Sequence, residues 1–148
     1  MVVTNDKEKI SLASIDALSQ LEHGKDSSAF ILSKSESVLD SIKKEIKSLS
    51  KDLSRTNLLD CSKNNISLVK CKSDKDIVNM INDCAPEHLV LLDDDFPKYV
   101  DSIENAGSVF CGSKSPVAFG DYASGTNHVL PTSGWAKSSS GLSTNDFV

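Results

Sequence analysis

The chain has 148 residues, of which 39% are hydrophobic and 25% are charged, as expected of one globular domain with its own core. Its net charge of -5 argues against a broad surface that binds nucleic acid. No apolar run approaches the roughly 20 residues that cross a bilayer, and the charged residues 6–9 interrupt any signal-peptide core. We therefore expect a cytoplasmic protein that has neither nucleic acid nor membrane as a partner.

Short apolar segments alternate with helical patterns along the first 112 residues. Strands are predicted at residues 1–4, 29–32, 66–69, 89–92 and 108–111. Helices are predicted at residues 11–23, 35–53, 73–84 and 95–107. The first helix is expected to bury Leu12, Ile15, Leu18 and Leu21, and Gly107 is expected to end the last one. Everything after Gly112 is rich in glycine, serine and proline and is predicted to be loop.

This alternation predicts an α/β fold, in which a mostly parallel, Rossmann-like sheet carries helices on both faces. Residues 1–112 would form the α/β portion, and residues 113–148 would be a glycine- and serine-rich active-site loop region of the same domain. No GxGxxG motif follows a strand, so the residues that bind a nucleotide cofactor stay unknown. Ligands usually bind at the carboxyl edge of such sheets.

Four cysteines, at positions 61, 71, 84 and 111, form neither a CxxC pair nor a close cluster with histidine. We expect them to be reduced and structural, with Cys84 and Cys111 as small core residues.

Glu87 and His88 form an adjacent pair of titratable residues that precedes a predicted strand. Histidine titrates near neutral pH, and burial can raise the pKa of a glutamate, so a turn that splays the two would allow two separate proton transfers. The alternative is structural, because an imidazolium at a helix C-terminus complements the helix dipole.

Two further groups of polar residues could hold a ligand. Gln20 and His23 share a helix face at i and i+3, where an amide oxygen and an imidazole could reach one metal ion. An ordinary surface helix end is the more frequent meaning of this pattern. Asp121 and His128 lie in a glycine-bounded segment and are suited to zinc, although a turn with Asx caps has a similar composition.

In order and spacing, these segments resemble histidinol dehydrogenases. That family has a QxEH segment, an APEHL segment and a GDYxSGxNHxLPT segment, which appear here as QLEH, APEHL and GDYASGTNHVLPT. Residues 105–112 also resemble the family segment that lies between the last two. The resemblance covers nearly the whole chain.

The resemblance implies an NAD-dependent oxidoreductase that converts L-histidinol to L-histidine in two steps and requires zinc. It implies that Gln20, His23 and Asp121 are metal ligands, that His88 accepts the hydroxyl proton, and that Glu87 activates the water. Gln20, His23, His88, Asp121 and His128 would contact the substrate. For the complete enzyme the family implies a homodimer.

The resemblance also implies that the chain is a middle-to-C-terminal part of the enzyme, without the region that binds most of the NAD and without a partner-supplied histidine ligand. We expect an incomplete domain that is inactive, or nearly so, by itself. Two alternatives stay open: a degenerate module that binds zinc or imidazole without redox activity, and one half of a split enzyme. A soluble domain with idle motifs is the least specific interpretation.

Overall fold

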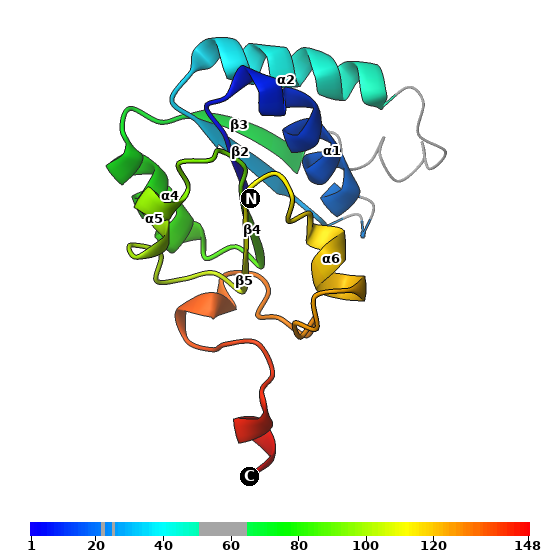
Figure 1. Cartoon of the computed structure of the whole chain (residues 1–148), viewed down its shortest axis with the longest axis vertical. Coiled ribbons are helices and arrows are strands. Elements are labelled where there is room, and N and C mark those ends of the chain that lie inside the picture. Colours follow the sequence, from blue (N-terminus) through cyan, green and yellow to red (C-terminus); the bar gives the residue numbers. More distant parts are fainter. Residues whose placement is uncertain (22, 25, 51–64) are drawn as a thin grey trace.

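A computed structural model describes residues 1–21, 23–24, 26–50 and 65–148 and shows an α/β architecture (Figure 1). Its five strands are β1 Val2–Val3, β2 Ala29–Ser33, β3 Ile66–Lys70, β4 His88–Leu91 and β5 Ser108–Cys111. They form one sheet in the order β3-β2-β1-β4-β5, and every pairing is parallel. This is the order of the first five strands of a Rossmann sheet, so the predicted fold class is confirmed.

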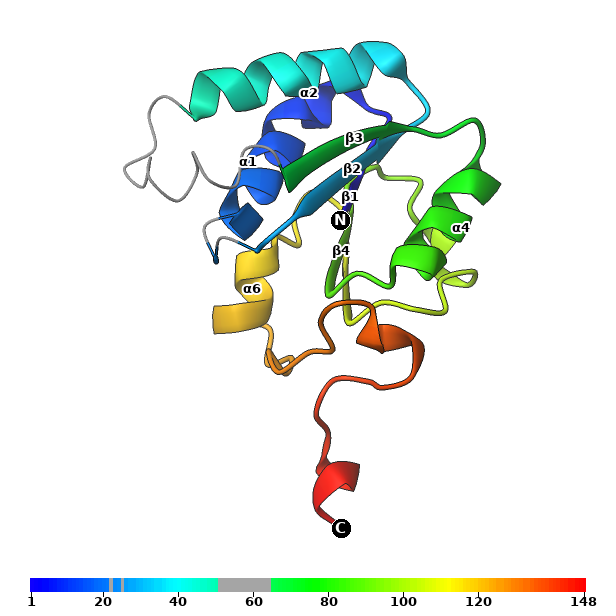
Figure 2. The same cartoon turned by 180° about the vertical axis from the view of Figure 1, so that it is seen from behind.

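Helices cover both faces of the sheet. The helical elements are η1 Lys7–Lys9, α1 Ile10–Leu21, α2 Glu36–Leu49, α4 Asp74–Cys84, α5 Pro97–Val100, α6 Val117–Tyr122, η3 Trp135–Lys137 and η4 Thr144–Phe147. Figures 1 and 2 show α1 and α2 on one side of the sheet and α4 with α5 on the other. After α6 the chain turns back past the edge of the sheet near β5, and only its last part, with η4, extends away from the sheet toward the C-terminus.

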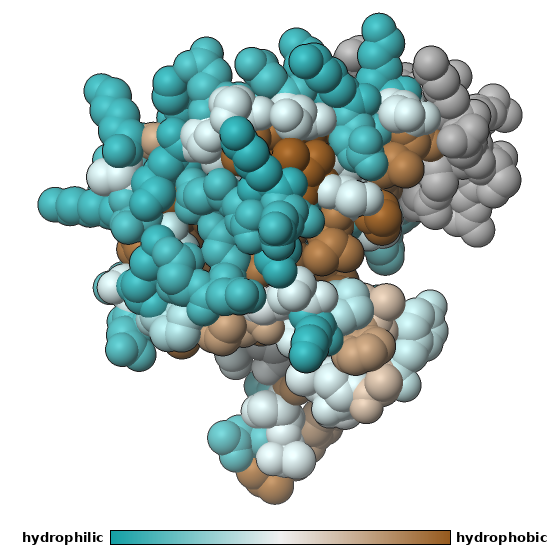
Figure 3. Space-filling model, turned by 45° about the horizontal axis from the view of Figure 1, so that its top comes forward, coloured by the Kyte–Doolittle hydropathy of each residue, from teal (hydrophilic) through white to brown (hydrophobic). Residues whose placement is uncertain are grey.

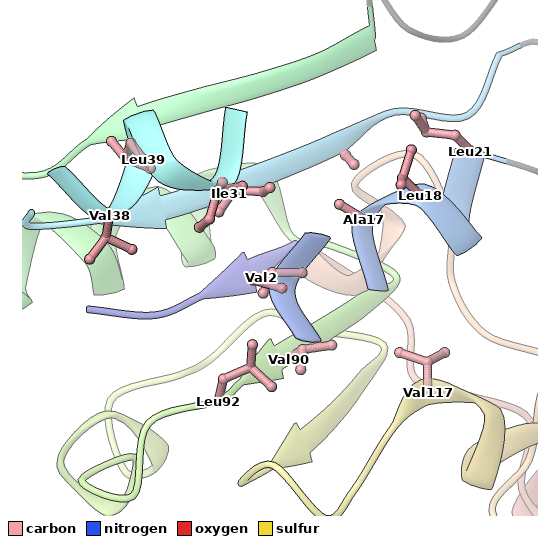
Figure 4. Packing of buried hydrophobic residues seen from close by; sticks show 13 residues of the cluster. Val2, Ala17, Leu18, Leu21, Ile31, Val38, Leu39, Val90, Leu92 and Val117 are labelled. Atoms are coloured by element: carbon pink, nitrogen blue, oxygen red, sulfur yellow. The ribbon is translucent and has the colours of Figure 1, made fainter. Parts of the chain in front are cut away.

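Two hydrophobic clusters fix these layers, because successive strand residues point to opposite faces. Val2, Ile31 and Val90 are paired across three strands and pack with α1 and α2 in the first cluster (Figure 4). Val3 and Leu91, their neighbours along the strands, pack with α4 and α5 in the second. The sheet therefore has two buried faces, which explains why its strands are apolar at nearly every position.

The outer surfaces of the helices are polar. Figure 3 shows hydrophilic side chains over most of the face that includes α2, with apolar residues visible between them. Leu12 and Ile15 are two exposed apolar residues of α1, at 40% and 50% exposure.

The predicted buried face of α1 was therefore partly wrong. Its buried residues are Ala13, Ser14, Ala17, Leu18 and Leu21. The two alanines allow α1 to lie close to α2 and the sheet, which turns the larger Leu12 and Ile15 outward.

The helix predicted from residue 95 to residue 107 is present as α5 but was predicted too long, because α5 ends at Val100. Beyond it, the backbone N–H groups of Glu104 and Asn105 donate to Oδ1 of Asn82, at 2.8 and 3.2 Å. Asn82 also donates to the carbonyl of Ser102, at 3.0 Å. These bonds to α4 replace the hydrogen bonds that would continue a helix.

Residues 113–148 are not entirely loop, as they include α6 and the short helices η3 and η4. Pro116 precedes α6 with an extended backbone, and Val117 is 5% exposed in the first hydrophobic cluster. The buried Val117 and Gly120 thus anchor a helix that is too short to show a period.

The remaining local predictions had mixed outcomes. Ser73 begins α4 as predicted, and its side chain accepts from the N–H of Asp76 at 3.1 Å. Ser35 precedes α2, but its side chain makes no capping bond, and residue 53 lies outside the described part of the chain. Cys71 is buried in the second hydrophobic cluster, and the half-buried Cys84 and Cys111 pack against that cluster, so they lie at the margin of the core and not in its centre. All three are free thiols. Residue 61 also lies outside the described residues.

Candidate functional site

A cavity of about 670 Å³ lies at the amino ends of the central strands. All six residues singled out by the sequence line it: Gln20, His23, Glu87, His88, Asp121 and His128. They come from the end of α1, the start of β4, the end of α6 and the loop that follows it. Side chains separated by as many as 108 positions in sequence therefore share one space.

The cavity occupies the edge opposite to the one that parallel sheets usually use for ligands. Residues 26–28, which precede β2, and residues 85–88, which precede or begin β4, form its walls. The position of Glu87 and His88 before a strand, which the sequence indicated, is thus a consequence of a site at the amino edge.

Asp93 instead organises the carboxyl edge. Asp93 is 9% exposed, and its carboxylate accepts from Thr4 Oγ1 at 2.6 Å, from the Asn5 N–H at 2.7 Å and from Asn5 Nδ2 at 3.1 Å. The side-chain oxygen of Asn5 in turn accepts from the N–H of Lys34, at 2.7 Å. These bonds join the segments that follow β1, β2 and β4, where a Rossmann protein would hold its nucleotide.

His88 is the first residue of β4, and its carbonyl accepts from the nitrogen of Met1 at 2.6 Å. Its side chain lies on the same face as Val90, toward α1 and α6. Burial lowers the pKa of His88, while the negative charges of Glu87 and Asp121 oppose that change. The net shift favours the neutral imidazole, the form that can accept a proton.

The backbone around Glu87 is tightly held. Ala85 ends α4 in a left-handed conformation with φ of 47°. The N–H groups of Gly107 and Ser108 donate to the carbonyls of Pro86 and Glu87, at 2.9 and 2.8 Å. A Cβ atom at Gly107 would lie 2.6 Å from the Glu87 carbonyl oxygen, so only glycine permits this approach. Gly107 serves as a contact point and not as the helix stop that the sequence suggested.

Gln20, His23 and Asp121 also line a second cavity, of about 490 Å³, between α1 and α6. They thus form part of the wall between two spaces. Within the described residues, no group of three or more His, Cys, Asp or Glu side chains is placed to hold a metal ion. A three-ligand set here therefore has to include the amide of Gln20. Its two oxygen donors and one imidazole nitrogen fit zinc chemically and would leave a coordination position open.

His128 lies in the exposed loop after α6. Asn127 shapes this loop, since its Oδ1 accepts from the N–H of Val129 at 2.8 Å and its Nδ2 donates to the carbonyl of Leu142. Gly125 has φ of +74°, the left-handed conformation that glycine adopts without strain. The glycine and Asx signals of the sequence therefore do describe a turn, and that turn carries His128 to the cavity.

Sequence reasoning missed several residues of the cavity wall. Phe30 and Cys84 line it, as do residues 132–134 from the C-terminal segment. Phe30 and Cys84 have the apolar character of core residues, and their position only becomes apparent once β2 and α4 are placed side by side. In Ser133, a φ of 53° marks an unusual backbone that no sequence pattern indicated.

Among the described residues, no helix has the length and apolar character needed to cross a membrane.

Comparisons with known proteins all point to one family. The family model for histidinol dehydrogenase matches residues 1–148. Histidinol dehydrogenases of Methanosarcina barkeri and Colwellia psychrerythraea are 35% and 39% identical to the chain, over 100% and 99% of its length. The chain spans about a third of these curated relatives, 34% of each.

A multifunctional relative and a solved structure agree. A histidine biosynthesis trifunctional protein of Candida albicans is 39% identical over 99% of this chain and 18% of its own. The crystal structure of histidinol dehydrogenase from Elizabethkingia anophelis matches with a TM-score of 0.93 and 35% identity, over 97% of this chain and 33% of the other.

Proposed function

The chain belongs to the histidinol dehydrogenase family, and from this premise we propose that it carries the zinc ligands and the two bases for NAD-dependent oxidation of L-histidinol to L-histidine. The observation that carries the proposal is the gathering of Gln20, His23, Glu87, His88, Asp121 and His128 around one cavity. When bound, NAD would accept a hydride at each of two oxidation stages, and zinc would orient the amino and imidazole groups of the substrate.

His88 is proposed to accept the proton of the substrate hydroxyl group in the first stage. A base for this step has to be neutral at the working pH. Burial lowers the pKa of His88, and this supports the assignment because it keeps the imidazole unprotonated near neutrality.

Glu87 is proposed to activate the water molecule that attacks the aldehyde in the second stage. Glu87 and His88 are adjacent, line the same cavity and belong to a backbone segment held by Gly107 and Ser108. Two bases on one rigid segment can act in turn on the same carbon atom of a bound substrate.

Gln20, His23 and Asp121 are proposed to hold the zinc ion, and all three, with His88 and His128, are proposed to contact the substrate. We assign residues 113–148 to the same domain as its active-site segment. A cytoplasmic location and, for the complete enzyme, a homodimer follow from the family and complete the proposal.

Equilibrium binding of zinc to the chain, measured by competition with a chromophoric chelator, tests the ligand assignment. We expect one site whose affinity falls at least about tenfold in Asp121→Asn and in His23→Ala, because each variant removes one of three protein ligands. Asp26→Asn is the matched control, since Asp26 lines the same cavity but is not a proposed ligand.

A second control addresses the thiol in the cavity wall. Cys84→Ser should leave the zinc affinity unchanged. If Cys84→Ser abolishes binding while Asp121→Asn does not, the proposed ligand set is wrong.

We further propose that the 148 residues do not turn over histidinol by themselves, and that activity requires the additional length of the relatives. Mixing the chain with zinc, NAD and L-histidinol should give no NADH absorbance. Zinc-dependent formation of two NADH per histidinol would overturn this part of the proposal without affecting the ligand assignment.

A further inference from the structure

The ring of Phe110 lies between the proposed base and the helix that carries Asp121. Phe110 is on β5, paired with Val90 of β4, and so is a diagonal neighbour of His88 across the strand pair. The two rings have their centroids 6.0 Å apart and are tilted by 41°. On its other side, Phe110 approaches Gly120 so closely that a Cβ atom there would lie 2.9 Å from Cε1 and Cζ of the ring.

The contact with Gly120 leaves no room for a side chain. Gly120 is buried within α6, and its carbonyl accepts from Thr126 Oγ1 at 3.2 Å. At the start of α6, Val117 belongs to the hydrophobic cluster against which Phe110 also packs. α6 is therefore seated on Phe110 at its middle and on the core at its beginning.

From this geometry we infer that Phe110 is a positioning residue, whose ring sets the placement of His88 relative to the segment of α6 that bears Asp121. The inference rests on the proposed function, in which His88 is the base and Asp121 a zinc ligand. It adds a residue that touches neither of the two cavities described above. Because packed interiors transmit small displacements, a methyl group added at Gly120 would move the ring against His88.

Proton NMR of the zinc-free chain can detect this transmission, since the chain has only three histidines and a His88→Gln variant identifies the His88 ring signals. In Gly120→Ala, we expect the His88 ring signals to shift. In the Phe110→Ala background, the same Gly120→Ala change should leave the His88 signals where Phe110→Ala alone places them, because the added methyl group then has space.

Two further variants separate positioning from a general loss of structure. Phe110→Tyr keeps the ring and should preserve both the His88 signals and their response to Gly120→Ala. Val109→Ala is the control on the same strand: Val109 is 41% exposed, and as the next residue it points to the opposite face, so no shift is expected.

Equal shifts from Gly120→Ala with and without Phe110, or no shift in either background, would overturn the inference. If Gly120→Ala fails to fold by circular dichroism, Phe110→Ala carries the test. It should then shift both the His88 ring signals and the backbone amide signal of Asp121, and an unmoved Asp121 amide would contradict the inference. These outcomes do not depend on zinc, so a failure to bind zinc would count against the proposed function alone.

Discussion

At the scale of single residues, the site depends on an imidazole whose pKa is lowered by burial and on a glycine that no other residue can replace. The His88 side chain at the start of β4 is partly buried, and this burial lowers its pKa. Gly107 has no side chain and therefore allows the backbone before β5 to approach the carbonyl of Glu87. Both features were invisible in the sequence: Glu87 and His88 showed that acid–base chemistry was available, but only the fold shows what surrounds them.

The first prediction concerns the pKa of His88. In an NMR titration of the zinc-free chain, His88 should titrate below 6.5, because burial disfavours the imidazolium. Between that lowered pKa and 6.5 the unfolded chain binds more protons than the folded one, so the contribution of His88 to stability is lost as the pH falls through this window.

A Glu87→Gln variant should lower the pKa of His88 further, since it removes the negative charge that partly offsets burial. A His88 pKa at or above 6.5, or a rise in Glu87→Gln, would show that burial does not control this residue.

The second prediction concerns Gly107. Gly107→Ala should reduce the free energy of unfolding by roughly 2 kcal/mol, because the added Cβ would meet a backbone oxygen that cannot rotate away. Urea denaturation measures the change. Gly24→Ala is the control, since its nearest neighbour would be Ser27 Oγ at 3.8 Å, and a similar loss there would contradict the explanation.

At the scale of elements, the sheet has its polar network at one edge and its cavity at the other. Asp93 joins the ends of β1 and β4 through bonds to Thr4 and Asn5, and Asn5 extends the network to the end of β2 by accepting from the N–H of Lys34. The cavity lies at the opposite, amino edge, where Glu87 precedes β4 and His88 begins it.

The third prediction tests the role of Asp93. Asp93→Ala should lower the free energy of unfolding by about 3 kcal/mol, because it leaves the buried hydroxyl group of Thr4 and the half-buried N–H of Asn5 without their acceptor. Asp94→Ala is the matched control, since the side chain of Asp94 is 90% exposed. Equal losses in the two variants would contradict this role.

The elements also show which parts of the fold the sequence could predict. All five strands were located to within two residues at each end, because short apolar runs between turn residues are characteristic of buried parallel strands. The last predicted helix was too long, because bonds from Asn82 to residues 104 and 105 are made across the fold. α6 was missed because it has only six residues, which is too short to show a helical period of apolar side chains. The proline before it and the glycine within it are also typical of loops.

The candidate site was predicted as a set of residues but not as a place. Its six members were identified by motif, yet their common location depends on α1 and α6 meeting beside β4, which is a tertiary contact. Residues such as Phe110 and Phe30 have no motif of their own. Their positions follow only from strand register and helix packing.

At the scale of the whole molecule, the chain holds a sheet with both faces covered and a cavity at its amino edge, within about a third of the length of its curated relatives. The proposed bases and ligands all lie in this third, whereas the residues that contact NAD are not assigned to it. The fourth prediction therefore places the chain in the setting of a complete enzyme.

The most direct measurement is the NADH formed by a chimera in which these 148 residues replace the matching segment of the Colwellia psychrerythraea enzyme, which is 39% identical to them. We predict zinc-dependent turnover with two NADH per L-histidinol, and a loss of at least about 100-fold in His88→Asn, which removes a general base. A folded chimera without turnover, or one whose rate is unchanged by His88→Asn, would contradict the account.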